Sequence, residues 1–102
     1  MAAVESTTSV SGSTETNIHT ATGDEAVTIR IVNDQATATT VNLSKSTTTT
    51  TQQASGKLLP DGFSIDADSV YEITGVVMTT TNEFIVLFAS AAVSACVYGW
   101  QT

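Results

Sequence analysis

The sequence predicts an all-β fold, either an antiparallel β-sandwich or a jelly-roll-like arrangement, with about eight short strands. Short segments that alternate apolar and polar residues recur about every 8–12 residues, with turn-forming residues between them. No segment repeats apolar residues at helical spacing over three turns. Threonine and serine make up about three residues in ten, and threonine suits exposed strand positions because its branched side chain favours extended backbone.

The chain of 102 residues is long enough for one hydrophobic core and too short for two. We divide it into an extended N-terminal arm, residues 1–13, and a single β-sandwich domain, residues 14–102. The arm is rich in serine and threonine, and Val4 and Val10 are its only large apolar residues after the initial methionine. We expect at most a short strand around one of these valines.

The first strands of the domain follow directly. Residues 15–20 predict a strand with Ile18 pointing inward. Residues 24–43 predict a β-hairpin, because an alternating strand is interrupted by turn-forming residues from Asn33 onward and the alternation resumes at residues 40–43. The apolar residues of its first strand are Val27, Ile29 and Ile31.

The middle of the chain predicts loops and turns. Residues 44–55 contain five consecutive threonines and predict either an exposed loop or the solvated end of a strand. Pro60, Asp61 and Gly62 predict a tight turn, because proline fixes its own φ and glycine tolerates a positive one. Residues 66–69 are polar and predict a further turn.

Two more strands follow. Residues 70–78 predict a strand in which Gly75 marks either a bulge or the close approach of another backbone. Strict alternation places four of its residues on one face: Tyr71, Ile73, Gly75 and Val77. Residues 79–82 predict a turn, and residues 83–89, the most apolar run, predict a central strand covered on both faces.

Residues 94–101 predict the last strand. Cys96, Tyr98 and Trp100 share one face of it, and Val97 and Gly99 lie on the other. Alternation alone does not decide which face is the core. We expect an interface to involve the two large amphipathic side chains here and the two valines of the arm. These candidate interface residues are Val4, Val10, Tyr98 and Trp100.

The charge pattern excludes several partners. Charged residues are only 13% of the chain against a usual share of about 25%, and the net charge is −7. The cations are Arg30, Lys45 and Lys57, so no basic stripe exists to neutralise nucleic-acid phosphates or to bind an anionic membrane. The N-terminus lacks the features of a secretion signal, and no apolar run approaches about 20 residues, so we expect a soluble protein made in a cytoplasm.

The sequence offers few residues for chemistry. Cys96 is the only cysteine, so it forms no intrachain disulfide, and its apolar neighbours predict a buried thiol. His19 is the only histidine, and we expect it at the surface or on a strand edge. Asp61, Asp66 and Asp68 lack the spacing of a calcium loop and are expected to be solvated turn residues. We therefore expect a protein that is not an enzyme and that binds no metal or cofactor.

Several landmarks together resemble a family. They are Ile18-His19-Thr20-Ala21, Asn33, Leu59-Pro60-Asp61-Gly62 and Cys96-Val97-Tyr98-Gly99. In this order they resemble the small β-sandwich structural proteins of tailed-phage virions, over most of the chain from Thr16 onward. The sequence departs from that pattern at His19, where an aromatic residue is usual, and in its threonine run.

The resemblance implies a phage capsid decoration protein, also called a cement protein, located on the capsid surface of the virion. It implies a homotrimer that binds and stabilises the major capsid protein, with the arm reaching onto neighbouring subunits. Two alternatives stay open. One is a tail, neck or fibre component of the virion, and the other is a glycan-binding surface module with Trp100 and Tyr98 as stacking platforms.

Overall fold

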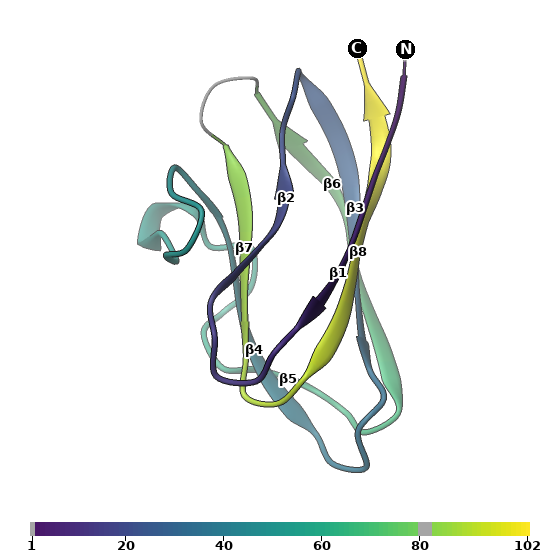
Figure 1. Cartoon of the computed structure of the whole chain (residues 1–102), viewed down its shortest axis with the longest axis vertical. Helices are drawn as coiled ribbons and strands as arrows, with labels where there is room; N and C mark the ends of the chain where they lie inside the picture. Colours follow the sequence, from purple (N-terminus) through teal and green to yellow (C-terminus); the bar gives the residue numbers. More distant parts are fainter. Residues whose placement is uncertain (1, 80–82) are drawn as a thin grey trace.

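The computed structural model describes residues 2–79 and 83–102, which form two four-stranded antiparallel sheets packed face to face (Figure 1). The strands are β1 (Ala2–Val10), β2 (Thr16–Thr20), β3 (Glu25–Asn33), β4 (Thr39–Ser46), β5 (Phe63–Ile65), β6 (Ser69–Met78), β7 (Phe84–Ala89) and β8 (Val93–Gln101). This confirms the predicted all-β sandwich. The turn expected at residues 79–82 falls mostly on residues 80–82, which lie outside the described residues.

The strand order is that of a jelly roll. The first sheet has the order β1-β8-β3-β6, and the second has the order β2-β7-β4-β5. Strands therefore pair first with last and inward from both ends: β1 with β8, β2 with β7, β3 with β6 and β4 with β5. This is the pattern of a long hairpin of eight strands rolled into two sheets. Within the described residues, no helix is long and apolar enough to cross a membrane.

The hairpin predicted at residues 24–43 is wrong. Its two strands form as β3 and β4, with the apolar residues buried as expected, but β3 lies in the first sheet and β4 in the second. The chain crosses between the sheets after Asn33, whose side chain is 0% exposed. Its Nδ2 lies 3.0–3.1 Å from the carbonyl oxygens of Thr37, Ile65 and Asp66. These contacts attach the segment that crosses between the sheets to the C-terminal end of β5.

The face of β8 that alternation left open is settled by the structure. Val97 is 0% exposed in the core between the sheets, whereas Tyr98 and Trp100 lie on the outer face of the first sheet. Cys96 also lies on this outer face and is half-buried, so the expectation of a buried thiol is wrong. The central strand expected at residues 83–89 is confirmed as β7, which lies between β2 and β4.

Gly75 forms a bulge in β6. Val27 pairs with Val76 and Ile29 pairs with Ile73, so β6 contains one more residue than β3 between these two pairs. Gly75 has a φ of +71°, and nothing lies within 4 Å of where its Cβ would be, which leaves the bulge rather than a close backbone approach as its role. Because the bulge reverses the alternation, Val77 points outward at 62% exposure. The prediction that it shares a face with Tyr71 and Ile73 is therefore wrong.

The N-terminal arm is for most of its length a strand of the sandwich. Ala2–Val10 forms β1, which pairs with β8 without interruption from Ala2 to Val10. Val10 is 1% exposed and Val4 packs against the core, because the alternating residues of this segment continue the inner face of the first sheet. The sequence predicted an extended arm with at most a short strand, whereas the strand has nine residues, because serine and threonine suit a strand with one exposed face.

The outer face of the second sheet is covered by the chain itself. The threonine-rich segment, residues 47–59, folds across β4 and β7 (Figure 1) and includes the short 3-10 turn η1 (Ala54–Gly56). Gln52 Nε2 donates hydrogen bonds to the carbonyl oxygens of Asn42 and Val86. Residues 47–51 are exposed, as predicted, whereas residues 44–46 of the expected loop form the end of β4, with Ser44 and Ser46 buried. Gly62, with a φ of +71°, confirms the predicted turn, in which Pro60 O accepts the hydrogen bond of Phe63 N.

Candidate functional site: an exposed apolar sheet face

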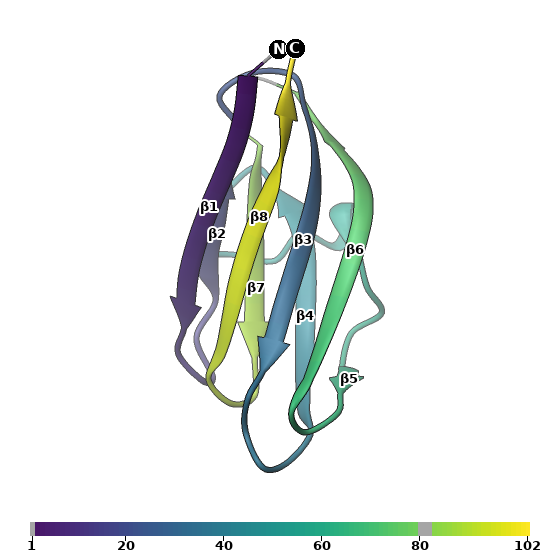
Figure 2. The same cartoon turned by 90° about the vertical axis from the view of Figure 1, so that its right-hand side faces the viewer.

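In the part of the chain that the structure describes, the outer face of the first sheet has no covering segment like that of the second sheet (Figure 2). Among the described residues, every exposed large apolar side chain lies on it. These side chains are Val70 at 48% exposure, Val77 at 62%, Tyr98 at 39% and Trp100 at 57%. They come from β6 and β8, with β3 between them. An apolar surface concentrated on one face is typical of a binding surface.

One row of this face is entirely apolar. The register places Ala3 opposite Trp100, Trp100 opposite Ala26, and Ala26 opposite Val77, across all four strands of the sheet. The row lies at the end of the sandwich where both termini emerge (Figure 2). We call these four residues, Ala3, Trp100, Ala26 and Val77, the apolar row.

An open groove of about 470 Å³ lies beside the apolar row. Its apolar lining residues are Ala26, Val77, Met78 and Trp100. Asp24 and Thr79 also line it. The groove therefore combines an exposed aromatic ring with hydrogen-bonding groups.

Tyr98 is held by a polar contact on the same face. Its hydroxyl donates a 2.9 Å hydrogen bond to Glu72 Oε2 on β6. This hydrogen bond raises the pKa of the Tyr98 hydroxyl above its usual value of 10.0, because it stabilises the protonated form. The bond spans β3 and fixes the orientation of the tyrosine ring on the sheet.

The four candidate interface residues separate into two pairs. The structure brings Tyr98 and Trp100 together on the outer face of β8, which decides the choice of face that alternation left open. It places Val4 and Val10 on the inner face of β1, where Val10 is part of the core and has no accessible surface to offer a partner. Val77 was missed as a candidate interface residue, because strict alternation does not include the extra residue of the bulge that turns its side chain outward.

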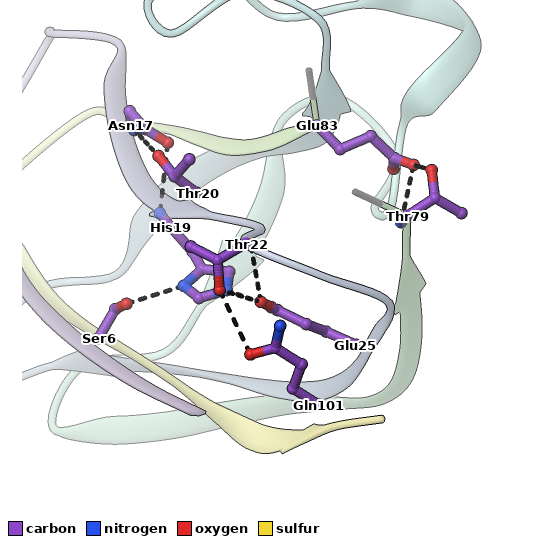
Figure 3. Close-up of polar contacts among 9 residues, drawn as sticks. All are labelled: Ser6, Asn17, His19, Thr20, Thr22, Glu25, Thr79, Glu83 and Gln101. Carbon is purple, nitrogen blue, oxygen red and sulfur yellow. Dashed lines mark hydrogen bonds and ion pairs between the residues drawn. The ribbon is translucent and has the colours of Figure 1, made fainter. Parts of the chain in front are cut away.

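A buried polar cluster ties the first three strands together (Figure 3). Ser6 Oγ on β1 lies 2.7 Å from His19 Nδ1 on β2, and His19 Nε2 lies 2.6 Å from Glu25 Oε1 on β3. The second carboxylate oxygen of Glu25 accepts a 2.9 Å hydrogen bond from the N–H of Thr22. We call Ser6, His19, Glu25 and Thr22 the polar clasp.

The polar clasp corrects the expectation that His19 is a surface residue. The side chains of His19 and Glu25 are 4% and 0% exposed. The signal for this was present in the sequence, because Glu25 is in phase with the buried Val27 of the same strand. A carboxylate at an inward position needs a buried partner, and the one histidine of the chain supplies it.

The polar clasp contains the residue types of a hydrolytic triad in a different arrangement. In such triads the serine bonds to histidine Nε2 and the acid to Nδ1, whereas here Ser6 is at Nδ1 and Glu25 is at Nε2. The imidazole is enclosed by the protein, and its 4% exposure leaves no surface for a substrate to approach. This geometry supports a structural role for the cluster.

No group of three or more metal-ligating side chains is found in the part of the chain that the structure describes. Of the three turn aspartates considered for calcium, Asp61 forms a 2.8 Å ion pair with Lys57, and Asp68 lies in a turn with a φ of +52°.

A second polar contact joins Thr79 at the end of β6 to Glu83 before β7 (Figure 3). Lys45 Nζ lies 3.5 Å from the same carboxylate.

No protein-family model matches the chain. No curated protein matches it either.

Proposed function

We propose that the outer face of the first sheet is a protein-binding surface, through which this protein attaches to the major capsid protein of a tailed phage as a decoration protein. The observation that carries the proposal is the placement of Trp100, Val77, Tyr98 and Val70 on this single face. Aromatic side chains at a centre of exposed apolar surface are the usual anchors of protein interfaces. The landmarks shared with small virion proteins supply the identity of the partner.

The strand order and the charge are compatible with this role. Double-sheet jelly rolls occur in viral capsid proteins, although a fold alone does not fix a function. The net charge of −7 disfavours packing against the nucleic acid inside a shell and suits an external position. These observations support attachment to the outside of the capsid.

The mechanism of attachment differs from the one expected of an arm. Because β1 is a strand of the first sheet, deletion of residues 1–13 removes an edge of the sandwich together with the buried Val10. Attachment is therefore assigned to burial of the apolar row and its neighbours. The large indole of Trp100, at 57% exposure, is the natural anchor.

The test is binding of purified protein to capsid shells assembled without it. Trp100→Ala should weaken binding at least about 30-fold, the loss typical of an interface anchor. The matched control is Thr49→Ala, at an exposed position in the segment that covers the second sheet, and this variant should bind like the wild type. Unchanged binding by the Trp100 variant, with shells that bind the wild type, would refute the assignment of the face.

The position in the virion is a separate question from the binding face. Hundreds of copies per particle, measured by quantitative gel, support a decoration protein. Six or twelve copies would instead support a tail, neck or fibre component, and the surface argument would apply to a partner there.

A glycan-binding role is the second candidate, favoured by the groove beside Trp100. An exposed indole can stack on a sugar ring, while Asp24 and Thr79 can hydrogen bond to its hydroxyls. Binding on a glycan array that is lost in Trp100→Ala would favour this role. An array without signal from the wild-type protein would dismiss it.

A further inference from the structure

The edges of the two sheets are unequal. Three of the four edge strands carry features that discourage pairing with another chain. The edge strand β5 has three residues, β2 has five and a register irregularity between Asn17 and His19, and β6 carries the bulge at Gly75. These features shorten or distort the row of unpaired backbone groups that each edge presents.

The fourth edge, β1, has none of these features. It runs nine residues from Ala2 to Val10, and its register with β8 has no shift over the whole length. It contains no proline, lysine or arginine, and Glu5 is its only charged residue. β8 is its sole paired strand within the described residues, so its other edge is free (Figure 2). A long, regular, nearly uncharged edge is a template for adding a strand.

We propose that the free edge of β1 pairs antiparallel with β1 of a second copy of this chain, so that the two first sheets join into one sheet of eight strands. The proposal rests on the edge of the sheet and is independent of the capsid-binding role assigned to its outer face. It commits to a dimer with two-fold symmetry, in which the same strand is used by both copies.

The sequence of β1 is self-complementary in one register. A strand of nine residues pairs with its own copy over its full length when Ser6 lies on the two-fold axis. This register places Glu5 opposite Thr7 of the second copy and Ala3 opposite Ser9. Residues of the outer face then oppose residues of the outer face, so the inner and outer faces of the two sheets remain continuous, and no like charges are directly opposed.

The polar clasp orders the middle of β1 before any pairing with a second copy. Ser6, at the proposed axis, is held by His19, which in turn is held by Glu25 of β3. The middle of β1 is thereby fixed to the sandwich on its inner face. Pairing of a strand that is already ordered costs less conformational entropy than pairing of a flexible arm.

Sedimentation equilibrium on the full chain tests the assembly first. The expected mass is twice the 10.6 kDa of one chain. A protein that is monomeric over the whole accessible concentration range, or that forms a trimer as the family resemblance implies, would overturn the proposal.

Two substitutions at Thr7 then test the register. Thr7→Glu places each new glutamate opposite Glu5 of the other copy, so two like-charge pairs form, and the dimer should weaken roughly 2- to 30-fold. Thr7→Lys places a lysine opposite each Glu5 instead and should strengthen the dimer. Thr7 is exposed on the outer face, so both variants should fold. Ser94→Glu, an exposed position on β8, is the control for added charge and should leave the dissociation constant close to that of the wild type.

The remaining outcomes are decisive. If Thr7→Glu and Thr7→Lys shift the dimer equilibrium in the same direction, or if Ser94→Glu weakens the dimer as much as Thr7→Glu does, the copies do not pair through β1 in this register and the proposal fails.

Discussion

His19 Nε2 lies 2.6 Å from Glu25 Oε1, with the two side chains 4% and 0% exposed. The pair joins β2 in one sheet to β3 in the other, and Ser6 extends it to β1. It therefore bridges the two sheets at a corner where no backbone ladder connects them. Buried polar pairs of this kind fix the relative position of the elements that carry them, while their net contribution to stability is small.

Removal of one partner of this pair should be costly. His19→Ala leaves Oε1 of the buried Glu25 side chain without its partner, while Oε2 keeps the Thr22 N–H, and should lower the free energy of unfolding by about 3–5 kcal/mol. The matched variant, in which both residues become leucine, removes the polar groups together and should lose less. Urea denaturation of the two variants measures the difference. A double variant less stable than His19→Ala would contradict this account of the pair.

The period of the strands was predictable from the sequence, but their pairing was not. Alternation at Val27 and Ile29 fixes a strand with one buried face, and it is the same whether the next strand along the chain lies in the same sheet or in the opposite one. The crossing between sheets depends on Asn33 reaching carbonyl groups such as that of Asp66, more than thirty residues away. A contact of that range leaves no local pattern.

The candidate site was predictable only in part. Tyr98 and Trp100 were recognisable as a pair on one face of the last strand, but the choice of face required the packing of Val97. Gly75 indicated either a bulge or a close backbone approach, and Val77 was placed on the wrong face because strict alternation does not include the extra residue of a bulge. The polar clasp was missed because a histidine among threonines is also typical of an exposed strand.

Asn33 should be among the least replaceable polar residues of the chain. Its Nδ2 lies 3.0–3.1 Å from three carbonyl oxygens, and its Oδ1 accepts a 3.0 Å hydrogen bond from the N–H of Gln35. Asn33→Ala removes the partner of these four backbone groups, of which the Ile65 carbonyl is buried, and should cost about 1–3 kcal/mol of unfolding free energy, or more if several stay unsatisfied.

Asn33→Asp is the sharper variant. It is nearly the same size, but it replaces the amide donor with a carboxylate oxygen facing carbonyl oxygens, so it should be at least as destabilising as Asn33→Ala. The half-buried Asn42 is the control, because its Oδ1 accepts one hydrogen bond, from Gly62 N at an exposed turn. Chemical denaturation in which Asn42→Ala cost as much as Asn33→Ala would contradict the role given to Asn33.

Two glycines should respond differently to a methyl group. A Cβ on Gly99 would lie 2.1 Å from the carbonyl oxygen of Ala26, so Gly99→Ala must separate β8 from β3 and should cost about 3 kcal/mol or more. A Cβ on Gly75 would meet nothing within 4 Å, and Gly75→Ala should cost only about 1–2 kcal/mol, for its φ of +71°. Thermal and chemical denaturation should rank them in this order. The reverse order would contradict the assignment of Gly99 to close packing and of Gly75 to the bulge.

Glu83 should make stability depend on acidic pH. Its partial burial acts to raise the pKa of the carboxyl, but hydrogen bonds from the N–H and hydroxyl of Thr79 and the charge of Lys45 outweigh burial and hold the pKa below its usual value of 4.5. A carboxyl with a lower pKa in the folded chain than in the unfolded chain contributes stability above the unfolded pKa. That contribution is lost as the pH falls through the folded pKa.

The comparison of wild type with Glu83→Gln isolates this contribution. The difference in unfolding free energy between the two proteins should be largest near neutral pH and should shrink as the pH falls below 4.5. Thr79→Val removes the hydroxyl donor and should reduce the pH-dependent part without removing it, because the Thr79 N–H and Lys45 remain. Urea denaturation at a series of pH values measures all three proteins. A difference between wild type and Glu83→Gln that stayed constant or grew toward acid would show that the carboxylate is not stabilised by these contacts in the folded chain.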